Sequence, residues 1–177
     1  MKLRSAIIVG LAALAGGCDD RVVQPPLEAL TAAQASDARS AANRIVGKNG
    51  RAVVICGQSD GLGVFTSDWK SGFGSDGMKD GRLAFRIRDD GREDVYSRDA
   101  MGTYLSSLED GSEVHRIFHP DRQIDSWIVS NPSTGIVETH NITTVPKDGL
   151  VDLWTSNKPV SVIGASAKLF RSSCVRA

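Results

Sequence analysis

The chain is poor in cysteine, histidine and aromatic residues. Of its 177 residues three are cysteine and three are histidine, and aromatic residues make up 6%. Three cysteines are too few for a multi-disulfide scaffold or a four-cysteine zinc site. The formal net charge is zero, and basic residues alternate with acidic ones, as in the segment 86–94. Because nucleic-acid affinity comes mostly from Lys and Arg that neutralise phosphates, the sequence predicts no nucleic-acid partner.

Long hydrophobic runs are also scarce, and the clearest one lies at the N-terminus. A positively charged start over residues 1–4 is followed by an apolar run over 6–14, which is too short to cross a bilayer as a mature helix. This pattern predicts a signal peptide over residues 1–17. The small residues 15–17 directly precede Cys18 and resemble the lipobox of bacterial lipoproteins, in which the cysteine is acylated. We therefore expect a lipid on Cys18 to anchor the chain to a membrane.

Two alternatives to lipid anchoring through Cys18 remain. Ala15 departs from the leucine that a lipobox prefers three residues before the cysteine, so an ordinary signal peptidase that cuts after Ala15 would release a soluble periplasmic protein. An uncleaved segment would instead form a buried N-terminal helix. Asp19 resembles the residue that retains lipoproteins at the inner membrane in enteric bacteria. The expected location is the periplasmic side of the cell envelope, lipid-anchored, with the inner membrane favoured.

The chain that remains after residues 1–17 has the size of one domain. Lys2 and Arg4 leave with the signal, so 19 basic residues stand against 21 acidic ones. Residues 18–50 are expected to hold the lipidated cysteine, a tether that contains Pro25 and Pro26, and one short Ala-rich helix over 27–46. Residues 51–177 are expected to form one β-rich domain.

The two cysteines of this domain are expected to pair. If Cys18 carries lipid, only Cys56 and Cys174 remain, and in an oxidising compartment they allow a single intramolecular connectivity. A Cys56–Cys174 disulfide would tie the first strand of the domain to its last residues. The alternative is two separate buried thiols.

From residue 51 onward the hydrophobic period is two, and β-branched and aromatic residues form short runs between glycine, aspartate and asparagine. The pattern predicts a mainly β fold, a single antiparallel meander that closes into a barrel or sandwich. Glycines favour tight turns at 89–91 and 131–135. We assign Phe85, Ile117, Trp127 and Trp154 to the core. The expected strands are 52–56, 63–67, 82–88, 94–98, 113–119, 125–130, 135–144, 150–156 and 160–171.

Several short segments carry a resemblance to a known family. Residues 54–61, 80–83 with 96–102, and 153–156 with Cys174 resemble an uncharacterised family of small exported proteobacterial β-rich domains. The similarity covers most of residues 52–174. It implies paired cysteines and a single β domain, and it implies no activity.

The segment 57–61 matches the G-x-S-x-G motif of serine hydrolases and follows an expected strand. Ser59 would be the nucleophile and His115, His119 or His140 the base. The motif needs a helix directly after the serine, whereas residues 62–66 are strand-like. A glycine-flanked hairpin turn explains the same residues, and we therefore expect no enzyme.

The histidines give only a weak indication of a metal site. On a strand His115 and His119 point the same way but lie roughly 13 Å apart at about 3.3 Å per residue, so one ion cannot bridge them. A site that adds His140 and Asp121 from neighbouring strands is the alternative to polar residues on a solvated face. Loop 67–81 contains aspartates without the spacing of a calcium-binding EF-hand. We predict no metal and no cofactor.

Trp69 and Phe73 lie in the glycine-rich loop 67–81 and form a candidate contact loop, unless both side chains plug one end of the barrel. The sequence thus favours a monomeric, non-enzymatic envelope lipoprotein whose β domain binds an envelope partner or ligand. One alternative is a calyx-like carrier of a small apolar ligand, which requires an open interior. The other is a hydrolase that acts through Ser59.

Overall fold

The computed structural model describes residues 50–66, 72–78, 82–98, 103–159 and 164–177. The expected signal peptide, Cys18 with its tether and helix, and Trp69 of the contact loop lie outside these residues. None of the described residues belongs to a helix long and apolar enough to cross a membrane.

Ten strands and one short 3-10 helix, η2 (Pro120–Arg122), make up the described part of the domain, which is mainly β as predicted. The strands are β1 (Arg51–Phe65), β2 (Gly74–Met78), β3 (Leu83–Ile87), β4 (Glu93–Arg98), β5 (Tyr104–Ser106), β6 (Glu113–His119), β7 (Ile124–Asn131), β8 (Ile136–Val145), β9 (Gly149–Lys158) and β10 (Ser166–Arg176).

The strands form one antiparallel sheet in the order β5-β4-β3-β1-β10-β9-β8-β7-β6. The long strand β1 lies in the middle of this order and pairs with β10 over most of its length. On its other side β1 pairs first with β3 and then, through its C-terminal half, with β2. The first and last strands of the described domain are therefore direct neighbours, and two runs of hairpins spread from them.

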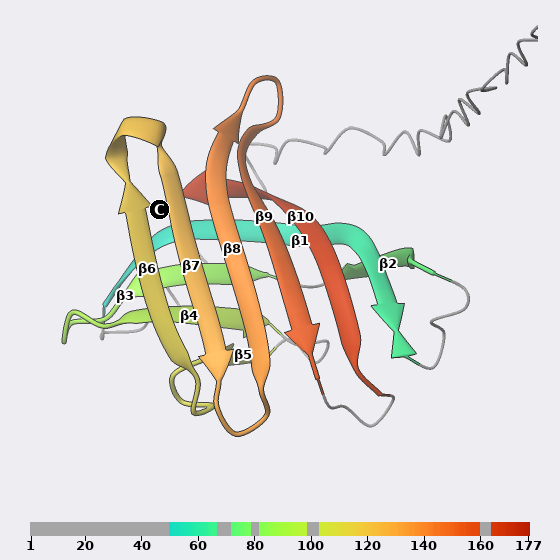
Figure 1. Cartoon of the computed structure of the whole chain (residues 1–177). Helices are drawn as coiled ribbons and strands as arrows, with labels where there is room; N and C mark the ends of the chain where they lie inside the picture. The colour runs from blue at the N-terminus through green and yellow to red at the C-terminus, as the bar shows by residue number, and fades with distance from the viewer. Residues whose placement is uncertain (1–49, 67–71, 79–81, 99–102, 160–163) are drawn as a thin grey trace, which may run out of the picture.

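The sheet curls into a half-barrel (Figure 1). Strands β6 to β10 form one wall, and β3, β4 and the first half of β1 cross behind them. The two ends of the sheet approach each other where β4, the neighbour of the short edge strand β5, lies near β6 without hydrogen-bonded pairing. The core fills the space between the walls and is built from Val54, Cys56, Leu83, Phe85, Val95, Val114, Trp127, Val129, Ile142, Trp154, Phe170 and Cys174.

The sequence-based strands agree with the structure in the hairpin regions. The expected strand 113–119 coincides with β6, and the two turns are present, with Gly91 and Gly135 at φ +82° and +69°. The last expected strand is displaced, because β10 covers residues 166–176. Strands β2 and β5 were not predicted, since their sequences are short and β2 is rich in glycine.

Two predictions about local structure were wrong, one about a hairpin turn and one about a core residue. The expected hairpin turn at 57–61 is part of the continuous strand β1. Ile117 does not belong to the core, because it is 47% exposed on the outer side of β6, while Phe118 on the other side is 50% exposed. Strand β6 is an edge strand, so neither face of its C-terminal half is covered. Phe85, Trp127 and Trp154 are buried as predicted.

Candidate functional site

The predicted disulfide is present and fixes the centre of the sheet. Cys56 of β1 and Cys174 of β10 lie directly opposite each other in the strand pair. Their Cα atoms are 4.0 Å apart, and the bond joins positions separated by 118 residues. Both side chains are buried in the core. The bond therefore locks together the first and last strands at the point where the two walls of the half-barrel meet.

A β-bulge directly after Cys56 orients Ser59. The strand pairing passes from Cys56 opposite Cys174 to Ser59 opposite Ser172, so β1 carries one extra residue. A bulge of this kind shifts the alternation of side chains by one position. Ser59 consequently faces the interior, as Cys56 does, and is 1% exposed. The G-x-S-x-G segment is thus a bulged strand, without the strand–turn–helix context that a nucleophilic serine needs.

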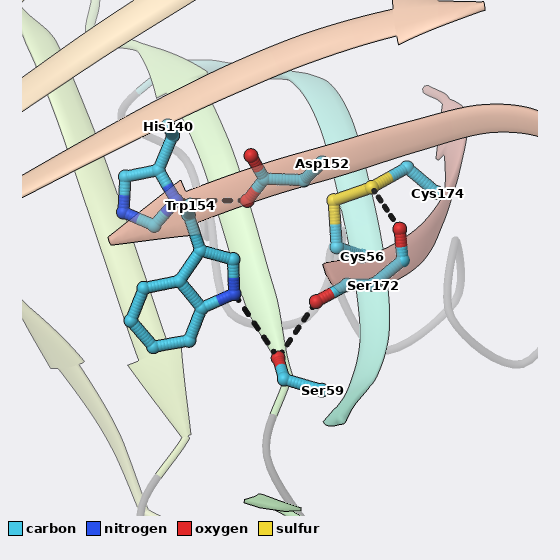
Figure 2. Close-up of a disulfide and its surroundings, with 7 residues drawn as sticks. All are labelled: Cys56, Ser59, His140, Asp152, Trp154, Ser172 and Cys174. Carbon is cyan, nitrogen blue, oxygen red and sulfur yellow. Dashed lines mark hydrogen bonds and ion pairs between the residues drawn. A yellow bond between two sulfur atoms is a disulfide. The ribbon is translucent and has the colours of Figure 1, made fainter. Parts of the chain in front are cut away.

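Ser59 takes part in a small hydrogen-bonded cluster beside the disulfide (Figure 2). Its hydroxyl oxygen lies 2.6 Å from that of Ser172 and accepts a hydrogen bond from Trp154 Nε1 at 3.3 Å. Two neighbouring strands thereby satisfy a hydroxyl that would otherwise be buried without partners.

His140 and Asp152 form a second buried pair in the same region. Nδ1 of His140 on β8 lies 2.8 Å from Oδ2 of Asp152 on β9, and neither side chain is exposed. The imidazole stacks on Trp154 at 5.2 Å and meets Phe85 edge-on at 5.1 Å between ring centroids. No described residue hydrogen-bonds to Nε2 of His140, which is also buried. The predicted placement of His140 on a solvated face was therefore wrong.

The cluster contains the residue types of a serine-hydrolase triad without its connections. In such a triad the base accepts a hydrogen bond from the nucleophile at about 2.6–3.2 Å. Here the hydroxyl of Ser59 pairs with Ser172 and Trp154, whereas His140 bonds to Asp152 (Figure 2). The other two candidate bases lie on the edge strand β6, where His115 and His119 are exposed. The geometry does not bring Ser59 together with any described histidine.

A third polar group lies where the edge of the sheet meets the core. The carboxylate of Asp125, which is fully buried, accepts hydrogen bonds from Arg116 Nε at 2.7 Å and Nη2 at 2.8 Å. The guanidinium also lies over the rings of Trp127 and Phe118. The hydrogen bonds to Asp125 raise the pKa of Arg116 above its usual value, although burial opposes this effect. Sequence reasoning missed this pair.

The comparisons with known proteins give no further guidance. No protein-family model, curated protein or solved structure matches the chain. Within the described residues, no group of three or more His, Cys, Asp or Glu side chains is placed to hold a metal ion. The chemistry of the site must therefore be inferred from its own geometry, which is that of polar groups sealed inside a core.

The other candidate residues lie apart from this cluster. Phe73, just before β2, is 62% exposed, the largest value among the exposed large hydrophobic side chains of the described residues. Its sequence neighbour in the predicted contact loop, Trp69, and the predicted lipidation site, Cys18, lie outside the described residues. The contact loop is thus represented by one aromatic ring that faces solvent.

Proposed function

We propose that the chain is a non-enzymatic protein of the bacterial cell envelope, anchored by a lipid on Cys18, whose β domain binds an envelope partner through the loop around Phe73. The observation that carries the proposal is the placement of reactive and apolar side chains. The polar groups of the core cluster, Ser59, His140 and Asp152, are buried and have hydrogen-bond partners there, whereas Phe73 is 62% exposed. Exposed aromatic side chains on loops are common anchors of protein contacts.

Burial of the polar cluster argues against an enzyme. A nucleophile must reach its substrate, and Ser59 is 1% exposed behind Trp154. The disulfide supports an exported protein, because such bonds persist in oxidising compartments. The signal-like residues 1–17 before Cys18 supply the rest of the support for the envelope location.

The interior favours a binding surface over a calyx-like carrier. Phe85 contacts both Trp127 and His140, and Trp154 stacks on Phe170 with 4.3 Å between ring centroids. These rings fill the space between the walls with side chains from both of them. A carrier would need that space for its ligand.

A photo-reactive amino acid at position 73 tests the proposal in the full chain and in its own envelope. We expect Phe73 replaced by benzoylphenylalanine to give one discrete cross-linked product in the membrane fraction. The matched control carries the same amino acid at Leu105, which is 52% exposed on β5. In a Cys18→Ser background both the membrane association and the product should be lost. A product at neither position, or at both alike, contradicts the proposed contact loop.

A further inference from the structure

The outer face of the wall formed by β6 to β10 has an unusual distribution of charge. Along β7, β8 and β9 side chains alternate between the core and the outside, and every ionisable residue within these strands takes an inward position: Asp125, Glu138, His140, Asp152 and Lys158. Outward positions carry only aliphatic, hydroxyl, amide or glycine residues. Solvated faces of antiparallel sheets normally show the opposite pattern.

Exposed apolar side chains lie at the centre of this face. The outer patch consists of Ile128, Val137, Thr139, Leu153, Thr155 and Leu169. Leu153 is 45% exposed, Leu169 53% and Val137 38%. The strand register places Ile128, Thr139, Thr155 and Leu169 in one row across four neighbouring strands. In Figure 1 no described element covers this wall from the outside.

Ionisable residues flank the outer patch on two sides. On one side β6 presents Glu113, His115 and His119, and on the other side Asp60 and Arg171 face each other across β1 and β10. Protein interfaces have the same anatomy, with charged residues depleted at the core and a polar rim around it.

Four of the polar side chains on this face are paired with each other. The hydroxyls of Thr139 and Thr155 lie 2.6 Å apart across β8 and β9. Ser126 on β7 donates to the amide oxygen of Asn141 on β8 at 2.9 Å. Water can therefore be removed from them at a lower cost, because burial of an unpaired hydroxyl or amide is what penalises an interface.

We propose that the outer patch binds a second copy of this chain, face to face across a two-fold axis. An uncharged surface needs an uncharged partner, and the same face on a second copy meets that requirement by symmetry. A lipid surface fits less well, because interfacial contacts use Trp, Tyr, Lys and Arg, which the outer patch lacks. This dimer replaces the expectation of a monomer.

The available area agrees with a weak dimer. Three rows of outward side chains run across the six strands β6 to β10 and β1. At about 4.8 Å between strands and 6.7 Å between successive outward residues, these rows would cover roughly 600 Å² if the sheet were flat, and the curl of the half-barrel makes this an upper limit. With the rim included, two copies would bury at most about 1,200 Å², which is the lower bound for a specific interface.

Cysteine cross-linking of the full-length chain in its native envelope tests the dimer. The variant Leu153→Cys is compared with Leu105→Cys, a leucine of similar exposure on β5, outside the outer patch. After treatment with a short bismaleimide, we expect at least about tenfold more product of twice the chain mass from Leu153→Cys, equivalent to 1.4 kcal/mol of preference. Adding Thr155→Lys to Leu153→Cys should abolish the product, with an unchanged melting temperature showing that the fold is intact.

Equal dimer yields from the two cysteine variants would overturn the proposal. A product of Leu153→Cys with a mass other than twice that of the chain would also overturn it, since the face would then serve a different protein. The inference does not depend on the contact loop or on lipidation. Loss of the product at position 73 leaves the cross-link at position 153 unaffected, so the two proposals fail separately.

Discussion

Buried ionisable side chains in this domain are held by specific partners. Asp94, which is fully buried, accepts hydrogen bonds from the hydroxyl of Ser106 and the backbone N–H of Leu108, and it lies 3.6 Å from Arg88. Asp125 and Asp152 have Arg116 and His140. A buried pair of this kind adds little stability compared with well-packed apolar side chains in the same place. Removing one member, however, leaves the other buried without a partner. They therefore specify which strands meet and in which register.

The His140–Asp152 pair allows a direct test of this coupling. We expect Asp152→Ala to lower the free energy of unfolding by about 1–3 kcal/mol, because Nδ1 of the buried imidazole loses its hydrogen-bond partner. The double variant His140→Phe/Asp152→Leu should lose about 1–3 kcal/mol less than the sum of its two single variants. Urea unfolding measures the wild type, Asp152→Ala, the single variants His140→Phe and Asp152→Leu, and the double variant. Additive losses would show that the two side chains do not act as a pair.

Ser59 should matter for stability and not for hydrolysis. In Ser59→Ala the indole N–H of Trp154 and the hydroxyl of Ser172 lose a buried partner, which should cost about 1–3 kcal/mol of unfolding free energy. Ser75→Ala, on the exposed side of β2, is the control and should be neutral. The wild type, Ser59→Ala and Ser75→Ala should all show the same background activity toward generic esters. An activity that Ser59→Ala removes would restore the hydrolase alternative.

Two of the buried carboxylates could have been identified from the sequence by their spacing from tryptophan residues. Asp125 and Asp152 each stand two residues before a tryptophan, Trp127 and Trp154, and in a strand such positions face the same side. A carboxylate in phase with a core tryptophan is therefore a candidate for a buried charge. The identity of its partner was not predictable, because Arg116 and His140 come from neighbouring strands whose register the sequence leaves undefined.

At the scale of strands, β1 shows why periodicity alone misplaced the first hairpin. Gly57, Gly61 and Gly63 resemble turn residues, yet all three lie within one strand. Gly61 is needed because β10 passes close to it: an added Cβ would collide with the backbone oxygen of Leu169 and would lie 2.7 Å from Cδ1 and 2.8 Å from Cα of Phe170. The sequence pattern cannot distinguish a glycine that turns the chain from one that makes room for a neighbour.

Gly61→Ala should therefore be much more damaging than alanine at another strand glycine. Its methyl group would push the backbone of β10 at Leu169 and Phe170 away from β1, and overpacking of this kind costs about 1–3 kcal/mol. Gly74→Ala on β2 is the matched control, since an added Cβ meets nothing within 4 Å there. The urea midpoint should fall for Gly61→Ala and stay unchanged for Gly74→Ala. Equal effects would mean that backbone freedom, and not the close approach of β10, explains the glycine.

The hairpin between β3 and β4 provides a test by titration. The side chain and the backbone N–H of Arg92 hydrogen-bond to the carboxylate of Asp90 and lower its pKa. A lowered folded-state pKa stabilises the hairpin above the ordinary Asp range, and this stabilisation is lost as the pH falls through the folded-state value. In Arg92→Ala the Asp90 pKa, followed by NMR, should rise toward its usual value. Arg122→Ala, on η2, should leave it unchanged.

At the scale of the whole molecule, the fold depends on contacts between distant parts of the chain. The two walls share β1 and β10, which come from opposite ends of the described domain. Pairing β1 with β10 requires closing a long loop, whereas the hairpins on either side form between segments that are close in the sequence. The class of fold and the disulfide were predictable from hydrophobic period and cysteine count. The place where the sheet stays open was not predictable, because the sequence pattern indicated closure without showing which strands fail to pair, and the path of the sheet ends at β5 and β6.

The disulfide should supply a large part of the stability of this arrangement. It closes a loop between positions 118 residues apart, which is worth about 4–5 kcal/mol in the chain-entropy model. The double variant Cys56→Ala/Cys174→Ala should lose close to that amount of unfolding free energy. Because both cysteines are buried and bonded, neither should react with an alkylating reagent in the unreduced protein, whether native or denatured, when the mass is measured. If both cysteines are alkylated without reduction, there is no disulfide, and the pairing of β1 with β10 alone holds the two walls together. The double variant should then lose far less than about 4–5 kcal/mol.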